Sequence, residues 1–146
     1  MLAEPEGASM NTIISLHTNG PGLYEISDHV RAFTAERGGM GVLTLFVQHT
    51  SCSLVIQENA DPDVRRDLDE FFRRLVPSGD DPSMSWLRHT LEGPDDMPAH
   101  IKAALLPVSL SIPVQNGRPM LGTWQGVYLF EHRDAPQTRQ VIAAMS

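Results

Sequence analysis

The chain has 146 residues, 41% of them hydrophobic and 20% charged, a composition typical of one soluble globular domain. Eleven Lys and Arg against eighteen Asp and Glu give a net charge of −7. This acidic balance disfavours a general nucleic-acid binder, because such a protein needs a basic face to displace counterions. No stretch approaches the ~20 apolar residues of a membrane span, so we expect neither nucleic acid nor a membrane as a partner.

The first ten residues contain two glutamates and have neither a basic end nor an apolar run, so no signal peptide is predicted. We expect a loose tail over 1–10 and a single domain over 11–146. The single Cys52 cannot form an internal disulfide, which fits a reducing compartment. These features together predict a cytoplasmic protein.

The first part of the chain is expected to form short strands and one helix. A strand at 12–16 ends before a glycine-rich break, and a serine is placed to cap a helix over 27–37. The best strand candidate is 41–49, in which alternate residues are apolar and His49 ends the apolar side. The segment 53–59 follows closely enough to be its hairpin partner.

The clearest helix is 62–75, which begins with an Asp-Pro pair and carries apolar residues at helical spacing. Its solvent side holds two oppositely charged i,i+4 pairs, Asp69/Arg73 and Glu70/Arg74. The last third has four strand candidates, with a turn at Asn116-Gly117: 109–114, 120–121, 126–131 and 139–145. Strands and helices do not strictly alternate, which predicts an α+β fold with a mostly antiparallel sheet.

The densest group of reactive side chains lies in Gly93–Lys102, which holds two adjacent carboxylates, a histidine and a lysine. Asp95 and Asp96 have two interpretations: both cap the following helix, or one caps it while the other binds a metal or orients His100. Lys102 near a helix start is electrostatically misplaced. It therefore either faces an anionic ligand or is an exposed lysine without a role.

Three histidines come from different predicted elements: His49 from a strand end, His89 from a loop and His100 from a helix. If they converge, they form an open metal site with a fourth position for water or substrate. Their long spacing matches no short ligand motif, and a lone histidine at a strand end is usually a packing residue. The other histidines have no such context and are expected at the surface: His17, His29 and His132.

The segment 122–126 is unusual as a connection between strands. Its glycines allow close backbone approach, Trp124 offers a flat face for stacking, and Gln125 both donates and accepts hydrogen bonds; the alternative is a buried tryptophan. Glu131 has apolar neighbours and needs a partner or a raised pKa. Arg139 is the candidate for a structural pair, and otherwise Glu131 is a proton acceptor or metal ligand.

Three motifs in this order resemble the YjbQ family, also called UPF0047 or secondary thiamine-phosphate synthase. They lie in His49–Arg65, Gly93–Lys102 and Gly122–Arg133, and the likeness extends from about residue 12 to 145. The resemblance implies a single α+β domain with a curved, mostly antiparallel sheet and helices packed on one face. It also implies a homotrimer with pockets near subunit boundaries.

The resemblance further implies weak synthesis of thiamine phosphate from a pyrimidine methyl diphosphate and a thiazole phosphate, with release of pyrophosphate. A divalent metal, zinc or magnesium, is expected at His49, His89 and His100. The expected catalytic residues are His49, Asp96, Lys102 and Glu131. The expected substrate-binding residues are Thr50, Ser51, Asn59, Trp124, Gln125 and Arg139.

One departure concerns the middle histidine, which the family often places after an aromatic residue and before an acid. Here Arg88 precedes His89 and Thr90 follows it, so no acid at position 90 can take part. Two alternative functions stay open: a metal-dependent hydrolase of a small substrate, and a non-catalytic trimer that binds a metabolite.

Overall fold

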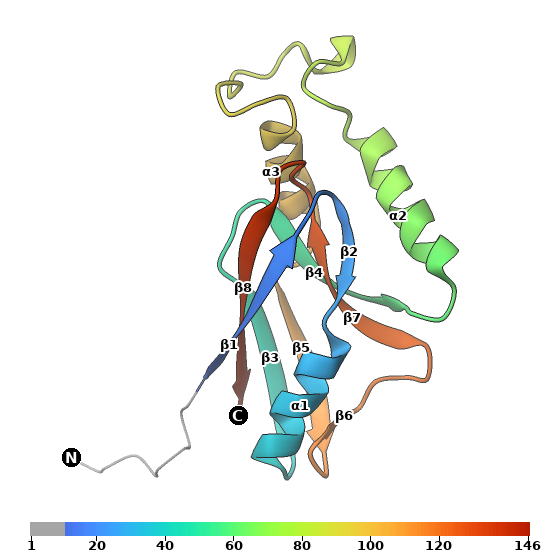
Figure 1. The fold of residues 1–146 in the computed structure, drawn as a ribbon, viewed down its shortest axis with the longest axis vertical. Coiled ribbons are helices and arrows are strands. Elements are labelled where there is room, and N and C mark those ends of the chain that lie inside the picture. Colours follow the sequence, from blue (N-terminus) through green and yellow to red (C-terminus); the bar gives the residue numbers. More distant parts are fainter. Residues whose placement is uncertain (1–10) are drawn as a thin grey trace, which may run out of the picture.

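The computed structural model describes residues 11–146, so the predicted tail at 1–10 lies outside the described residues. Within 11–146 the chain forms eight strands, three α-helices and one short 3-10 helix (Figure 1). The strands are β1 Thr12–Thr18, β2 Gly22–Glu25, β3 Gly41–Val47, β4 Cys52–Glu58, β5 Ser109–Gln115, β6 Arg118–Pro119, β7 Gln125–Glu131 and β8 Gln137–Met145. The helices are α1 Ser27–Arg37, α2 Pro62–Leu75, the 3-10 helix η1 Pro82–Met84 and α3 Asp96–Leu105.

The strands form two antiparallel sheets that share one hydrophobic core. The larger sheet has the order β1-β8-β3-β5-β6 and the smaller has the order β2-β7-β4. Alternation along β3 buries Leu43, Leu45 and Val47, as its sequence predicts. These residues join buried side chains of α1 and the smaller sheet in a single cluster. The predicted α+β fold with antiparallel strands is therefore confirmed.

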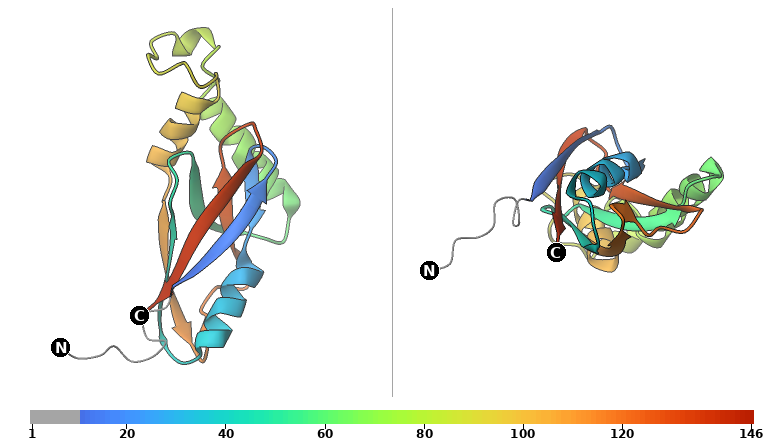
Figure 2. Two further views of the ribbon diagram at one scale, coloured as in Figure 1. Left: turned by 60° about the vertical axis from the view of Figure 1, so that its left-hand side comes forward. Right: turned by 90° about the horizontal axis from the view of Figure 1, so that it is seen from below.

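The helices contact different parts of the strands rather than one common face. α1 packs near β6, β7 and β8, α2 contacts β2, and α3 contacts β4. Figure 2 shows α1 at one end of the strands and α3 at the opposite end. This arrangement brings α3 and the loop before it to the end of the strands where β4 begins and β7 finishes.

The predicted hairpin between β3 and β4 is wrong. β3 pairs with β5 and β8, whereas β4 pairs with β7 in the other sheet. The short connection 48–51 carries the chain from one sheet to the other. Each strand thereby gains a partner along nearly its whole length. β3 also ends at Val47, so His49 lies just beyond the strand.

The local signal at the start of α2 is confirmed, whereas the cap predicted at the start of α1 is wrong. The side chain of Asp61 caps α2 by accepting a hydrogen bond from the amide of Asp63 at 2.9 Å. Ser27 does not cap α1: its hydroxyl donates to Glu25 and accepts from the amide of Val127. Ser27 therefore ties the helix start to β7 instead of satisfying the helix's own amides.

The Asn116-Gly117 turn is also present, with φ of 53° and 71°, as a two-residue hairpin requires. The strand after it is displaced from the predicted 120–121 to Arg118–Pro119. Among residues 11–146, no helix combines the length and apolarity that a bilayer crossing needs.

α2 is amphipathic, yet none of its residues is fully buried. It contacts the smaller sheet through Phe72, whose ring lies edge-on to Phe130 at 5.6 Å, and through Arg65, which donates to the Tyr128 hydroxyl. Phe71 and Leu75 remain more than half exposed. Figure 1 shows α2 alongside the strands rather than embedded among them. Its apolar stripe is therefore only partly covered within one subunit.

The shared core predicts a large difference between two substitutions on β4. Leu54 is fully buried in the core cluster, so Leu54→Ala should lower the free energy of unfolding by about 2–5 kcal/mol. Gln57 is exposed on the same strand, and Gln57→Ala should change the free energy of unfolding by less than about 0.5 kcal/mol. Urea unfolding followed by circular dichroism measures both; equal losses would contradict the assignment of the core.

Candidate functional site

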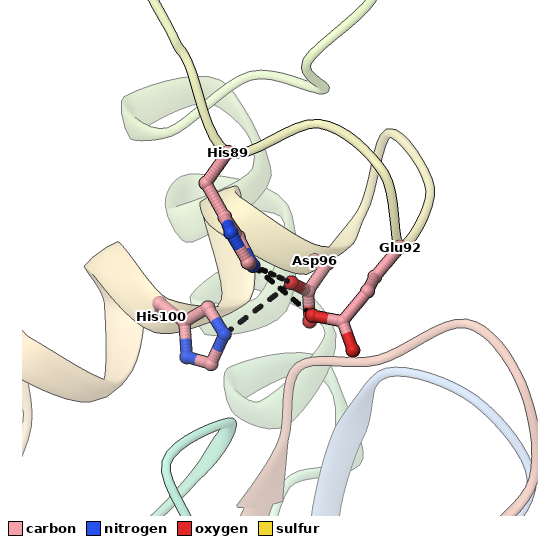
Figure 3. Close-up of side chains that lie close together, drawn as sticks. All are labelled: His89, Glu92, Asp96 and His100. Carbon is pink, nitrogen blue, oxygen red and sulfur yellow. Dashed lines mark hydrogen bonds and ion pairs between the residues drawn. The ribbon is translucent and has the colours of Figure 1, made fainter.

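Four potential metal-ligating side chains converge at the start of α3 (Figure 3). His89 and Glu92 come from the preceding loop, and Asp96 and His100 lie one helical turn apart on α3. The Nε2 atom of His89 lies 2.8 Å from Oδ2 of Asp96 and 3.0 Å from Oε2 of Glu92. Nε2 of His100 lies 3.3 Å from the same Asp96 oxygen. One ligating atom of each residue falls within 4.8 Å of the others.

The second ring nitrogen of His100 is fixed by the backbone. Its Nδ1 lies 2.9 Å from the carbonyl oxygen of Thr50. A carbonyl can only accept, so Nδ1 carries a proton, and the other ring nitrogen, Nε2, is the one that faces Asp96. Metal-ligating histidines are typically oriented in this way, by donating their other N–H to a carbonyl.

Arg133, which follows β7, holds the two carboxylates at the start of α3. Its Nη1 donates to Asp96 and its Nε donates to Asp95, each at 2.8 Å. The predicted helix cap is wrong, because Asp95 occupies the N-cap position without a side-chain cap bond, but Asp96 does contact His100, as the second interpretation expects. A charged guanidinium binds these carboxylates more strongly than neutral helix amides do.

The pKa of Asp96 reflects this environment. Burial opposes its ionisation, but the hydrogen bond from His89, followed by the charges of His100 and Arg133, outweighs burial. The pKa of Asp96 therefore lies below its ordinary value. A carboxylate that stays ionised while nearly buried is suited to hold a cation.

His49 does not join this cluster within residues 11–146. Its Nε2 instead accepts a hydrogen bond from the amide of Gln140 at 2.8 Å. Of the predicted metal trio, the structure brings together only His89 and His100, whose ring centroids lie 5.8 Å apart. The neighbouring Thr50 reaches the cluster instead, through its backbone carbonyl.

Glu131 and Arg139 form a buried ion pair, so the structural interpretation of this pair holds. Nε of Arg139 donates to Glu131 at 2.6 Å, and its Nη2 donates to the Ser51 hydroxyl at 2.8 Å. Thr18 donates to the same glutamate at 3.1 Å. Ser51 and Arg139, both predicted to bind substrate, are thus buried and engaged with other protein groups.

The adjacent Cys52 is also fully buried. Burial, partly offset by the charge of Arg139, raises the pKa of its thiol to about 12. A thiol that stays protonated is a poor nucleophile. Cys52 is therefore a core residue rather than a reactive one.

The predicted residues of the 122–126 segment lie at the start of β7, whereas the histidine cluster lies near its end. Gln125 and Glu131 are the two ends of this seven-residue strand, about 20 Å apart at ~3.3 Å per residue. Trp124 is 62% exposed, so the buried-tryptophan alternative is wrong. Gln125 accepts from the amide of Gly122, and Asn59 donates to a glutamate on β2. Within the subunit these residues are remote from the histidine cluster.

Lys102 lies in the last turn of α3, where a cation is electrostatically favourable, so the expected conflict with the helix dipole is wrong. It follows His100 by two residues, which places it about 200° around the helix at ~100° per residue. Its side chain is buried, and burial lowers its pKa. Lys102 therefore faces away from the His100 side of α3.

His132 is the clearest error among the sequence predictions, because it is 2% exposed rather than a surface residue. Its Nε2 lies 3.0 Å from the Ser53 hydroxyl, and its Nδ1 has no partner among the described residues. Burial, followed by the charges of Lys102 and Arg139, lowers its pKa to about 3. The ring is therefore neutral at ordinary pH.

Sequence reasoning missed two members of the site, Glu92 and Arg133. Glu92 lies three residues after His89 and four before Asp96, and this near-helical spacing of ligating residues is the signal that could have revealed it. Arg133 is the last residue of the recognised motif Gly122–Arg133. Nothing local indicates that its partners lie 37 and 38 residues upstream.

The low pKa of His132 predicts a defined dependence of stability on pH. Below about pH 6.5 the unfolded chain takes up a proton at this ring, whereas the folded chain does so only near pH 3. The free energy of unfolding should therefore fall as pH decreases through this window, by up to about 1.4 kcal/mol per pH unit.

In the variant His132→Phe this contribution should disappear, so the curve of stability against pH should flatten. Urea unfolding at several pH values between about 7 and 4 measures the effect. His29→Phe, at an exposed histidine, is the control and should keep the wild-type slope. Identical slopes in wild type and His132→Phe would contradict the prediction.

Comparison with known proteins agrees with the resemblance seen in the motifs. The family model described as UPF0047 protein YjbQ-like matches residues 12–146. A UPF0047 protein of Synechocystis sp. is 49% identical over 135 residues, which cover 92% of this chain and 89% of the relative. The UPF0047 protein YjbQ of Escherichia coli O157:H7 is 41% identical over 134 residues, covering 90% and 94%.

Solved structures give the same result. A conserved hypothetical protein from Thermus thermophilus superposes with a TM-score of 0.80 at 34% identity, covering 92% of this chain and 99% of that chain. An uncharacterised yjbq/upf0047 protein from Clostridium acetobutylicum gives a TM-score of 0.81 at 33% identity, with the same coverage. The chain belongs to the UPF0047 (YjbQ-like) family.

Proposed function

We propose that this protein is a cytoplasmic, metal-assisted enzyme that acts on a small phosphorylated or heterocyclic substrate. The observation that carries the proposal is the convergence of His89, Glu92, Asp96 and His100. Two imidazole nitrogens lie close to one oxygen of Asp96, whereas a simple ion pair needs only one partner for that oxygen. The side chains of His89 and Glu92 are 52% and 63% exposed, so a substrate has access.

The donor set fits an ion of the zinc class better than magnesium. Magnesium prefers oxygen ligands and retains waters, whereas imidazole together with carboxylate suits zinc and related ions. His89, His100 and Asp96 would hold the ion, and the Glu92 carboxylate would lie beside it. When bound, such an ion acts as a Lewis acid toward phosphoryl or carbonyl oxygens.

The protein's own groups orient this site and handle protons around it. Arg133 fixes Asp96 from one side, and the Thr50 carbonyl fixes His100 from the other. Glu92 is the most exposed carboxylate of the cluster and is the candidate proton acceptor. The side chain of Thr50 is exposed beside His100, where its hydroxyl is available to a substrate.

The reaction that we propose is thiamine phosphate formation, as the family resemblance implies. The bond between the pyrimidine methylene carbon and its diphosphate oxygen breaks, a bond to the thiazole nitrogen forms, and pyrophosphate leaves. Departure of a diphosphate needs positive charge and donors on its oxygens, and a cation site with nearby Arg133 supports such a step. Lys102 lies on the other side of α3, so this reacting centre does not include it.

A second candidate is a metal-dependent hydrolase of a small substrate. The exposed carboxylate of Glu92, beside two imidazoles, favours it because a general base next to metal ligands is typical of such enzymes. The products separate the two candidates. The synthase releases pyrophosphate only when both substrates are present, whereas a hydrolase consumes one substrate with water.

We also propose the homotrimer, supported by an apolar outer face of the larger sheet. Ile13, Val42 and Phe46 lie on this face and are 42–55% exposed. Phe46 pairs with Ile142, which in turn pairs with Ile13, so apolar side chains form a row across three strands. Contiguous exposed apolar surface of this kind marks interaction sites.

The metal proposal predicts that substitutions in the cluster remove a bound ion. Asp96→Asn and His89→Ala should weaken zinc binding by about a hundredfold or more, since even supporting residues cost 10–100-fold. Elemental analysis of untagged protein and zinc titration calorimetry measure the affinity, and assays of pyrophosphate release measure turnover. His29→Ala is the control. Stoichiometric zinc in both variants, or full turnover after chelation, would refute the site.

The assembly proposal predicts that a charge on the apolar face separates the subunits. Phe46→Lys should convert a trimer to monomers, because assembly would bury its ammonium in an apolar interface. Light scattering with size-exclusion chromatography gives the molar mass. Met40→Lys, at an exposed apolar residue beside the start of β3, is the matched control. A monomeric wild type would overturn the proposal.

A further inference from the structure

A cavity of about 270 Å³ opens between α2 and α3, on the side of α3 opposite the histidine cluster. Its lining comes from both helices, from the loop after α2, from the turn between β1 and β2 and from the segment after β7; its polar residues are Arg73, Ser78, Asp95, Lys102, His132 and Asp134. Pockets for drug-sized ligands measure roughly 300–1,000 Å³. This cavity is therefore suited to a smaller group.

The geometry of α3 separates the cavity from the metal-ligand cluster. Asp96 and His100 are four residues apart and share the face with the cluster. Asp95, Pro98 and Lys102 follow the i, i+3, i+7 spacing of a different face, which lines the cavity. The same short helix thus presents two sets of polar groups to two different places.

Lys102 is a largely buried residue that brings an ammonium group to this cavity. It is 7% exposed, and no hydrogen bond or ion pair within residues 11–146 engages its ammonium group. Three carboxylates act on its charge. Asp69 pairs with Arg73 at 3.0 Å, Asp95 accepts from Arg133 and from the amide of Asp134, and the exposed carboxylate of Asp134 lines the cavity without pairing with Lys102. Burying a cation without a close partner is costly, and an anion in the cavity would offset that cost.

His132 supplies a second unsatisfied group at the same place. Its side chain is almost fully buried, and its Nδ1 has no partner among residues 11–146. When the Ser53 hydroxyl donates to Nε2, the ring proton resides on Nδ1, which then can donate to a ligand. A buried donor left unpaired costs free energy comparable to a lost hydrogen bond. His132 and Lys102 both line the cavity, so an acceptor bound there is the candidate partner for both groups.

We infer that this cavity is a binding site for a small phosphate-bearing anion, with Lys102 and His132 as its inner contacts. Arg73 and Ser78 are exposed and lie at its rim, so donors approach from α2, α3, a loop and the end of β7. Donors from several directions suit the tetrahedral oxygens of phosphate better than a planar carboxylate. The site is separate from the proposed metal centre and does not depend on it.

Inorganic phosphate is the probe, titrated into the full chain at constant ionic strength. Nitrogen NMR of histidine-labelled protein should show a saturable shift of the His132 Nδ1 resonance, and calorimetry should give the affinity. Lys102→Met keeps an unbranched side chain, one atom shorter, and removes the charge, and it should weaken binding about tenfold or more. Asp134→Asn removes a competing negative charge from an exposed residue and should strengthen binding. Arg66→Met, at an exposed cation outside the cavity, should bind as wild type does.

Three results would overturn the inference: no saturable shift at His132, Lys102→Met binding phosphate as wild type does, or Asp134→Asn failing to strengthen binding. Asp134→Asn changes only an exposed side chain, so the test stands even if Lys102→Met proves unstable. Zinc titration of the same variants separates the two sites. Lys102→Met should retain the metal stoichiometry, and loss of zinc binding in Asp96→Asn should leave phosphate binding intact.

Discussion

The contact between Arg133 and the two aspartates of α3 is the interaction on which the candidate metal centre depends. Among its apolar residues α3 fully buries only a proline and two alanines, so hydrophobic contact alone holds it weakly. Arg133 joins its first turn to the end of β7 through charge-assisted hydrogen bonds. The amide of Arg133 in turn donates to Glu131, which is locked to Arg139 inside the core. The packed strands therefore fix the position of α3, and with it the orientation of His100.

Much of the fold could be predicted because its signals are local. The alternation in β3, the cap and charge pairs of α2 and the Asn116-Gly117 turn each depend on residues close in sequence. Strand pairing was not accessible in the same way. β3 and β4 are near neighbours in the chain, yet each pairs with strands far away, because burying both apolar faces around one core favours two sheets over one hairpin. The prediction that Ser27 caps α1 was wrong for the same reason, because its hydrogen-bond partner Val127 lies 100 residues away.

The candidate site was predictable by residue type and less so by geometry. His89, Asp96 and His100 stand out in the sequence as chemically capable groups, and the structure brings them together. The strand position of His49 suggests a place beside them, but a backbone amide at Gln140 occupies its ring nitrogen. His132 escapes notice because no sequence pattern reports that a polar residue just beyond a strand is enclosed by helices from elsewhere. The burial of a polar group and its hydrogen-bond partner depend on tertiary structure. Composition and periodicity therefore predicted neither the partner of His49 nor the burial of His132.

The enclosed position of Cys52 has a practical consequence for studying the protein. Its thiol is fully buried and remains protonated at neutral pH, so alkylating and maleimide reagents find no thiolate to attack in the folded state. The natural chain holds no other cysteine, so its folded form should not react with thiol labels. A cysteine introduced on the open face of α2 would carry a fluorophore or spin label at a single defined position, from which movement of that helix against its neighbours could be followed.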